Sequence, residues 1–511
     1  MKAPLRFETL LFLFLLFCAA YFRHPVEYDN SLSRFFLLSA VVDDGTLAID
    51  RNAGETVDAS RAGGRVYSNK AIGAPLLAVP VYYALRRWTP IRNDAPLSPR
   101  ARYLCILAIS GVPFALAGAA LMRLLIGMGA EPRSAFDATL AYGLGTLAWL
   151  HSSLFSGHQL AASASLISFA LLRAKGRGRP TLLSAGLLAG LAVLADYTAL
   201  LIAAPLAAYV VTRKGSASEK AVFLSGLGAA VVLWPIYNLL CFGSPWTLSY
   251  ARLTLPAFAE GAGRGLWGVG LPRLGPLLGL IGSPSRGLFF TMPVLLLAPT
   301  GLWAMRRRLP REAALIAAVS VGYVLAISGF YGWHGGWAFG PRYLVPMLPF
   351  LALPIAFSPD RRWLAPLLGL SILQIGFAQA VVPDVTEWVR NPIPETLYPL
   401  LERGYGAAGW GTSLGLASGW SLALFAALAA AGVGLLTREL GAPERPTSAG
   451  RGGPVFWLYP CAFAAIILAL ALVRTPPEIQ VHQFNARLLR DAARDLHSPG
   501  LSLQAQLEAA E

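Results

Sequence analysis

The sequence predicts an all-α polytopic membrane protein with about 13 transmembrane helices and interfacial helices in its outer loops. Of its 511 residues, 55% are hydrophobic and only 14% are charged, and apolar runs recur along the whole chain. An average soluble domain is roughly 25% charged, and its core could not hide this much apolar surface. Many of the runs approach the length of about 20 residues that crosses a bilayer as a helix.

The charged residues indicate orientation in a membrane. The formal net charge is +15, but the basic residues form short clusters between apolar runs instead of one patch. Such clusters mark cytoplasmic loops, so we expect membrane lipids as partners and no nucleic acid. The four cysteines, Cys18, Cys105, Cys241 and Cys461, lie inside apolar segments without metal-ligand spacing, and we interpret them as packing residues.

Five short basic loops assign the sides of the membrane. We expect residues 173–179, 213–220, 306–311, 361–362 and 438–451 to face the cytoplasm. The first span then ends at Phe22, and later spans lie near residues 102–122, 136–152, 158–173, 221–241, 287–305, 313–330, 343–357, 364–382, 413–436 and 454–473.

Two apolar segments do not fit a single span. Residues 182–212 have basic loops on both sides and one charge, Asp196, near the centre, so the segment must cross the membrane and return. Two short helices meeting at Asp196 on the outer side satisfy this requirement, with Asp196 near a cavity. Residues 71–85 are too short for a comfortable span, contain Pro75 and Pro80, and are predicted to lie at the outer interface.

The resulting layout has a cytoplasmic N-terminus, an extracytoplasmic C-terminus and one large transmembrane domain. Residues 1–474 form the transmembrane domain, with a first outer loop at residues 23–100 and a second at 242–286. Residues 475–511 form a short extracytoplasmic C-terminal tail, too small for a core of its own. We expect the chain to be a multi-pass protein of the cell inner (plasma) membrane.

Ionisable residues are scarce within the spans and gather in the outer loops, which suggests a site on the outer face. The first outer loop begins with His24, Glu27 and Asp29, directly after the first span. A carboxylate at this position could deprotonate an acceptor hydroxyl or hold a metal, or could simply begin a solvated loop.

Several motifs together resemble bacterial GT-C glycosyltransferases of the protein O-mannosyltransferase and aminoarabinose-lipid A transferase type. An acidic residue follows the first helix, and the loop ends in Tyr67-Ser-Asn-Lys70 before a short Pro-containing apolar helix. Further echoes are Phe155-Ser-Gly-His158, Gly190-Leu-Ala-Val-Leu-Ala-Asp196-Tyr197, Tyr237-Asn238, Phe242-Gly-Ser-Pro245, Ser283-Pro-Ser-Arg286-Gly and Gly335-Gly-Trp-Ala-Phe-Gly-Pro-Arg342.

The resemblance implies a GT-C-like fold and a membrane glycosyltransferase. Such an enzyme moves a sugar from a polyprenyl-phosphate carrier to a lipid, glycan or protein acceptor on the extracytoplasmic face. It implies that Asp29 is the catalytic base of an inverting transfer, with Glu27 as the second choice. The leaving lipid phosphate would need cations, for which Lys70, Arg286 and Arg342 are the candidates.

Other residues of the motifs are candidates with two interpretations each. His158 could assist proton transfer or be a structural hydrogen-bonding residue at a helix end. Asp196 could bind the sugar or anchor a loop. Trp337 could stack on a sugar ring or mark the membrane interface, and Tyr67 belongs to the same predicted substrate-binding set.

Two departures from the family pattern leave the cofactor open. Lys70 is followed by Ala-Ile-Gly, where relatives often have Pro-Pro or Ala-Pro-Gly. Many relatives carry a second acidic residue in the outer loop before the fourth span, where this chain has His151 and His158. No cofactor is therefore predicted with certainty, and a divalent metal and its ligands stay undetermined.

Two alternatives to an enzyme remain at the level of sequence. One is a lipid-linked sugar transporter or flippase with an outer vestibule and no transferase chemistry. The scarcity of charges within the spans argues mildly against it, although a flippase needs fewer charges than an ion-coupled pump. The other is a catalytically silent membrane scaffold.

Overall fold

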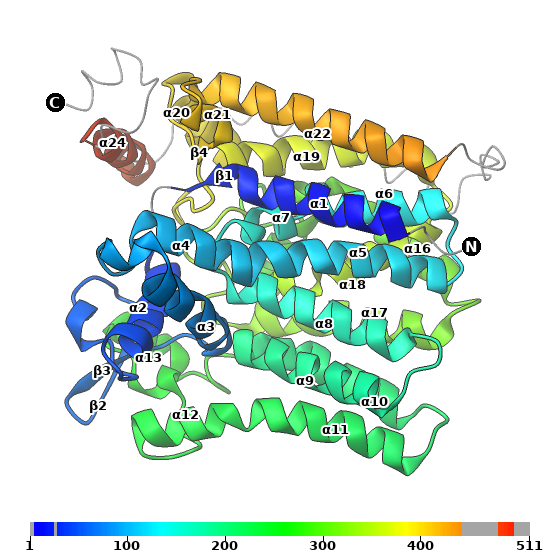
Figure 1. Cartoon of the computed structure of the whole chain (residues 1–511), viewed down its shortest axis with the longest axis horizontal. Helices are drawn as coiled ribbons and strands as arrows, with labels where there is room; N and C mark the ends of the chain where they lie inside the picture. The colour runs from blue at the N-terminus through cyan, green and yellow to red at the C-terminus, as the bar shows by residue number, and fades with distance from the viewer. Residues whose placement is uncertain (1–4, 25–27, 442–478, 495–511) are drawn as a thin grey trace.

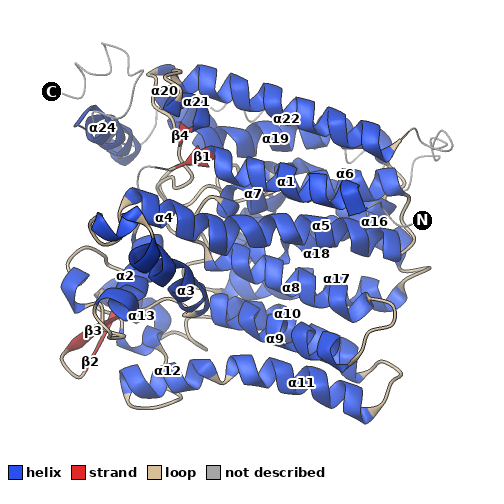
Figure 2. Ribbon diagram, viewed as in Figure 1, coloured by secondary structure: helices blue, strands red, loops and turns tan. Residues whose placement is uncertain are grey.

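The computed structural model describes residues 5–24, 28–441 and 479–494. Long helices lie side by side in a bundle, and a second group of short elements, α2, α3, β2, β3 and α13, covers one end of it (Figure 1). Helices dominate, and the strands are confined to short pairs (Figure 2). The predicted all-α class is therefore confirmed.

The helices of the bundle follow the chain in order. They are α1 (Leu5–Tyr21), α4 (Pro99–Ile106), α5 (Val112–Gly127), α6 (Pro132–Gly145), α7 (Leu147–Ser152), α8 (Gly157–Arg173), α9 (Arg179–Ala195), α10 (Leu200–Val211), α11 (Ala217–Val231), α12 (Leu233–Phe242), α14 (Leu274–Gly282), α15 (Leu288–Thr291), α16 (Leu297–Met305), α17 (Pro310–Gly329), α18 (Leu348–Ala352), α19 (Leu364–Ala380) and α22 (Ser418–Leu440).

Within the described residues, five helical stretches are long and apolar enough to cross a membrane: Pro99–Gly127, Ala217–Phe242, Pro310–Gly329, Arg361–Ala380 and Ser418–Leu440. Shorter apolar helices lie between them. Large apolar side chains such as Leu240, Val321 and Leu373 are more than half exposed on these helices. Water disfavours so much exposed apolar surface, whereas lipid covers it without cost.

Several of the predicted spans are broken helices, and two of them show the cause plainly. Thr146 is extended between α6 and α7, with φ −131° and ψ 164°, and its hydroxyl caps α7. Residues 342–357 contain Pro346, Pro349 and Pro354, and alternate between 3₁₀ turns and the short helix α18. Proline removes a backbone donor, so a regular α-helix cannot run through this segment.

The segment around Asp196 forms two short helices that meet at Asp196, as expected. Helix α9 ends at Ala195 and α10 begins at Leu200, with the 3₁₀ turn η4 (Tyr197–Ala199) between them. Asp196 caps that turn, because its carboxylate accepts a hydrogen bond from the Thr198 amide at 3.0 Å. Both helices lie in the bundle (Figure 1).

The first outer loop is more ordered than the sequence indicated. It contains α2 (Asp29–Asp43), η1 (Asp50–Asn52), the hairpin of β2 (Ala59–Ala62) and β3 (Arg65–Ser68), α3 (Gly73–Trp88) and η2 (Pro90–Asn93). Gly63 and Gly64 form the hairpin turn with φ values of 57° and 79°, which only glycine adopts freely in succession. Helix α3 is the predicted short apolar helix, and it packs on α2 and α9.

The remaining loops carry short elements. The second outer loop contains η5 (Ser249–Arg252) and α13 (Pro256–Ala262). Strand β1 (Phe22–Arg23) pairs antiparallel with β4 (Ala408–Gly409), near η10 (Ile393–Leu397), α20 (Tyr398–Glu402) and α21 (Trp410–Ser413). The pairing ties the end of α1 to the start of α22.

Helix α24 (Ile479–Arg494) is the described part of the C-terminal tail. Its apolar side chains Val481, Phe484 and Leu488 are buried. The Asn485 amide donates to the Glu395 carbonyl oxygen at 3.0 Å, so this helix packs on the protein. The predicted span at residues 454–473 lies outside the described residues.

Candidate functional site

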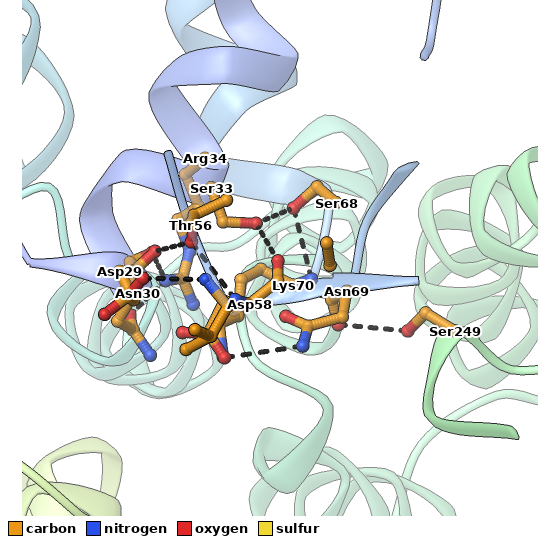
Figure 3. Close-up of polar contacts among 12 residues, drawn as sticks. Asp29, Asn30, Ser33, Arg34, Thr56, Asp58, Ser68, Asn69, Lys70 and Ser249 are labelled. Carbon is orange, nitrogen blue, oxygen red and sulfur yellow. Dashed lines mark hydrogen bonds and ion pairs between the residues drawn. The ribbon is translucent and has the colours of Figure 1, made fainter. Parts of the chain in front are cut away.

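Asp29 is the first residue of α2, where a negative charge is favoured by the helix dipole. Its Oδ1 atom accepts a hydrogen bond from the Val57 amide at 2.8 Å, and its carbonyl accepts one from the Thr56 hydroxyl at 3.3 Å (Figure 3). Among the described residues, no partner binds the Oδ2 atom. The half-buried carboxylate is therefore held by one oxygen and can use the other. Glu27 lies outside the described residues.

A buried ion pair lies beside Asp29. Lys70 Nζ is 2.7 Å from Asp58 Oδ1, and the two side chains are only 12% and 11% exposed. Burial alone would raise the pKa of Asp58, but the charge and hydrogen bond of Lys70, with Arg342, hold this pKa below its ordinary value. Lys70, which the sequence proposed as a phosphate ligand, is thus already paired with a carboxylate.

Hydrogen bonds fix this pair to the neighbouring elements. The Ser33 hydroxyl on α2 donates to the Asp58 carbonyl at 2.6 Å and contacts the Ser68 hydroxyl at 2.7 Å (Figure 3). The Ser249 hydroxyl, from the second outer loop, donates to the Asn69 carbonyl at 3.0 Å. Both outer loops therefore build the surroundings of Lys70.

Arg34 is a cation that sequence reasoning missed. It lies on α2, is 4% exposed, and donates to the Asn30 carbonyl at 2.7 Å and to the Asn30 side chain. Burial lowers the pKa of Arg34, while Tyr250, Asp196 and Asp58 oppose that change. Its Nε atom is buried, and no described residue is its hydrogen-bond partner. The signal available in the sequence was a lone arginine in the apolar stretch after Asp29.

His158 and Asp196, separate candidates in the sequence, contact each other. The ring Nδ1 atom of His158, at the start of α8, contacts Asp196 Oδ2, while Oδ1 accepts from the Thr198 hydroxyl at 2.8 Å. The His158 Nε2 atom is buried without a partner in the described part of the chain. The Tyr343 ring lies 5.7 Å away, centroid to centroid.

Two glycines bring these parts together. A Cβ atom on Gly157 would lie 2.2 Å from the Ala195 carbonyl oxygen and 3.2 Å from Arg34 Nη2. A Cβ on Gly73, the first residue of α3, would lie 2.5 Å from the Ala195 amide nitrogen. Helices α2, α3 and α8 therefore converge on the turn at Asp196, and larger residues at these glycines would force them apart.

Arg286 is used to hold a loop. Its guanidinium donates to the Ala338 carbonyl and, at 2.7 Å, to the Gly336 carbonyl. Burial and the neighbouring Arg342 lower the pKa of Arg286 to about 10. These contacts hold the loop that carries Trp337, and the role of Arg286 as a phosphate ligand stays a prediction.

Arg342 has a freer guanidinium. It lies over the Tyr343 ring at 5.2 Å, and its buried Nε atom has no partner among the described residues. Asp384, which the sequence did not single out, belongs to the same cluster. Burial raises the pKa of Asp384 to about 7, although Arg342 and Arg286 oppose the rise.

The two predicted aromatic residues differ in their surroundings. The Trp337 ring lies between Tyr28, which precedes Asp29, and Phe484 of α24, with centroid distances of 5.5 Å to each. Tyr67 is 8% exposed and packs against Phe242 at 5.6 Å. Trp337 thus borders the start of α2, whereas Tyr67 is a buried residue that packs against another ring.

A metal site does not emerge from the part of the chain that is described. There, no three His, Cys, Asp or Glu side chains come together as metal ligands. Glu27, one of the acidic candidates, is not among the residues covered.

Among the comparisons with known proteins, the one with solved structures gave matches. No protein-family model and no curated protein sequence matches the chain. The crystal structure of ArnT from Cupriavidus metallidurans bound to undecaprenyl phosphate matches 96% of this chain and 80% of that chain, with 16% identity and a TM-score of 0.48. The apo form of ArnT matches 95% and 79% of the two chains, with 16% identity and a TM-score of 0.45.

An archaeal protein gives a similar result. The apo structure of the Archaeoglobus fulgidus oligosaccharyltransferase matches 94% of this chain and 59% of that chain, with 13% identity and a TM-score of 0.43. ArnT and the archaeal oligosaccharyltransferase are both GT-C glycosyltransferases, the group that the sequence motifs resemble. With identities of 13–16% and TM-scores below 0.5, no property of these proteins is transferred to this chain.

Proposed function

We propose that the chain is a membrane glycosyltransferase that moves a sugar from a polyprenyl-phosphate carrier to an acceptor on the extracytoplasmic face. The observation that carries the proposal is the half-buried Asp29 carboxylate, held by one oxygen beside a buried cluster of cations. The acceptor is a lipid, glycan or protein hydroxyl. In this topology the N-terminus is cytoplasmic, residues 1–474 form the catalytic membrane domain, and residues 475–511 form an extracytoplasmic tail.

The proposed reaction is a single inverting displacement. Asp29 accepts the proton of the acceptor hydroxyl, and the oxygen attacks the anomeric carbon of the donor sugar. The bond from that carbon to the phosphate oxygen breaks, and polyprenyl phosphate leaves with the bonding electrons. Because Asp29 begins a helix, its negative charge is stabilised before the proton arrives.

The leaving phosphate requires positive charge, and Arg342 and Arg34 supply it best. Arg34 is buried and Arg342 is partly buried, and the Nε atom of each has no hydrogen-bond partner among the described residues. A guanidinium offers phosphate two parallel donors. Lys70 adds charge from its pair with Asp58. In this proposal Arg286 fixes the loop of Trp337, and His158 positions Asp196.

The test is sugar transfer by the purified chain in lipid, with labelled polyprenyl-phosphate sugars as donors and a membrane extract as acceptor. Replacing Asp29 with Asn keeps the shape but removes the base, so the rate should fall by about 10²–10⁴. Asp50→Asn is the matched control, because Asp50 lies in the same loop and its Oδ1 accepts from the Val66 amide at 2.7 Å.

Each other outcome has a defined meaning. Equal rates for wild type and Asp29→Asn would remove Asp29 as the base, and loss of transfer in Glu27→Gln would then assign Glu27. Carrier movement across the bilayer without any transfer product, in every variant, would replace the enzyme proposal with transport.

A further inference from the structure

A crevice outside the proposed transfer site lies where α1 ends and α4 begins. It is narrow and partly open to the outside. The basic side chains Arg23, His24 and Arg102 line it together with the apolar Phe22, Ile106 and Leu107. None of the residues proposed to move the sugar belongs to its lining.

The basic side chains of the crevice have unused donors. Among the described residues, no hydrogen-bond partner binds the buried Arg102 Nε atom or the buried Nδ1 atom of His24, a side chain that is 8% exposed. The Nδ1 atom of His24 is a donor in the tautomer that carries the proton there. The other ring nitrogen of His24 lies 3.2 Å from the Ser153 hydroxyl. A buried donor without an acceptor is costly, so these groups call for a ligand that accepts hydrogen bonds.

The ionisable side chains that line the crevice include basic residues but no carboxylates. No aspartate or glutamate lines it, and neither Arg23 nor Arg102 forms an ion pair within residues 5–24, 28–441 and 479–494. Burial lowers the pKa of His24 to about 4, so the positive charge of the crevice comes from Arg23 and Arg102. Two like charges that line the same crevice favour an anion between them. The ligand chemistry indicated is therefore anionic, and phosphate oxygens suit guanidinium donors.

The other half of the crevice is apolar and belongs to a candidate span. Ile106 and Leu107 lie in the stretch Pro99–Gly127, which is apolar and long enough to cross a membrane. At this level the helix contains a π-helical turn, η3 (Leu107–Gly111), a distortion that is frequent at functional sites. Basic groups at the end of a span and apolar groups along it suit an amphiphilic ligand, which has a charged headgroup and an apolar chain.

We propose that this crevice binds the phosphate headgroup of a membrane lipid, with Arg23, Arg102 and His24 around the phosphate and an acyl chain along α1 and α4. The site goes beyond the proposed function, because it binds a lipid whether or not the chain transfers a sugar. A lipid fits better than free phosphate because the apolar lining would leave a bare anion partly unsolvated.

The test is lipid binding by the detergent-purified full chain, measured by native mass spectrometry. The probes are phosphatidylglycerol and diacylglycerol with the same acyl chains. Arg102→Gln and Arg23→Gln should each weaken the tightest phosphatidylglycerol site by about tenfold, the usual effect of losing a charged hydrogen bond. Diacylglycerol, which lacks the phosphate, should bind at least tenfold more weakly than phosphatidylglycerol.

The control is Arg100→Gln, because Arg100 is exposed on the same helix and does not line the crevice. It should bind phosphatidylglycerol as wild type does. Arg102→Lys should lose less than Arg102→Gln, since it keeps the charge but not the planar fork. If Arg102→Gln does not fold, the exposed Arg23 provides the decisive variant.

Two results would overturn the proposal. Equal affinity for the Arg100→Gln and crevice variants would remove the crevice as the lipid site. Displacement of the lipid by a large excess of inorganic phosphate would make it a simple anion site. Sugar transfer is not measured in this experiment, so a failure here and a failure of the proposed enzyme activity are distinguishable.

Discussion

Removing the charge of Lys70 should destabilise the protein strongly. Lys70→Met preserves the length of the side chain but removes the close cation from the Asp58 carboxylate, which is 11% exposed. Within the described residues, the carboxylate then keeps the Asn69 Nδ2 donor at 3.4 Å and the charge of Arg342. Breaking one side of a buried ion pair costs about 3–5 kcal/mol, because the remaining charge is uncompensated. The double change Asp58→Asn with Lys70→Met should cost less than the two single changes added, by about 1–3 kcal/mol.

The measurement is the free energy of unfolding in detergent, followed by tryptophan fluorescence at pH 7. The pKa of folded Asp58 is lowered, so its contribution is present above the unfolded value of about 3.9 and is lost as the pH falls through the folded value. At pH 7 the contribution is therefore complete, and acidification should shrink the difference between wild type and variant.

The same loop offers a control. Arg65 and Asp50 form an ion pair at 3.1 Å, but their side chains are 53% and 45% exposed. Solvent screens such a pair, so Arg65→Met should cost less than about 1 kcal/mol. If Lys70→Met costs no more than Arg65→Met, or if the double-mutant cycle gives no coupling, the buried pair does not stabilise this end of the molecule.

Three further changes test other parts of the site. Arg286→Met should remove two carbonyl contacts and lower the thermal midpoint, whereas Arg286→Lys should recover part of the loss; an unchanged midpoint would contradict its loop-holding role. Because burial raises the pKa of Asp384 to about 7, folded stability should fall as the pH rises from about 4 to 7, and Asp384→Asn should flatten that slope. His158→Phe should leave the Asp196 carboxylate without its ring partner and cost about 1–3 kcal/mol in a denaturation series, with no loss expected if the contact is incidental.

The presence of the long helices could be predicted from the sequence, because the bilayer restricts which backbone structures can cross it. Backbone groups in lipid must bond within their own helix, so long apolar runs such as residues 310–329 reveal themselves by composition. The same reasoning placed the turn at Asp196 between two short helices, as found. The breaks at Thr146 and Pro346 were harder to predict, because apolar composition continues through them.

The first outer loop was predicted less well. Asp29 was expected at the start of a loop, whereas it begins α2, whose polar and apolar residues do not stand out against a chain of such high hydrophobicity. Arg34 was overlooked for the same reason. Asp384 carries no motif, and only its packing beside Arg342 and Arg286 makes it a member of the cluster.

The sequence by itself determined that the chain is helical and apolar, and which loops carry its polar chemistry, because these properties follow from composition and local spacing. Only the tertiary structure decided how the charges are used. It pairs Lys70 with Asp58 and bonds Arg286 to carbonyl oxygens. In the described part of the chain, it leaves the Nε donors of Arg34 and Arg342 without a partner. These partners lie far apart in the chain, and the strength of a buried charge depends on its neighbours in space.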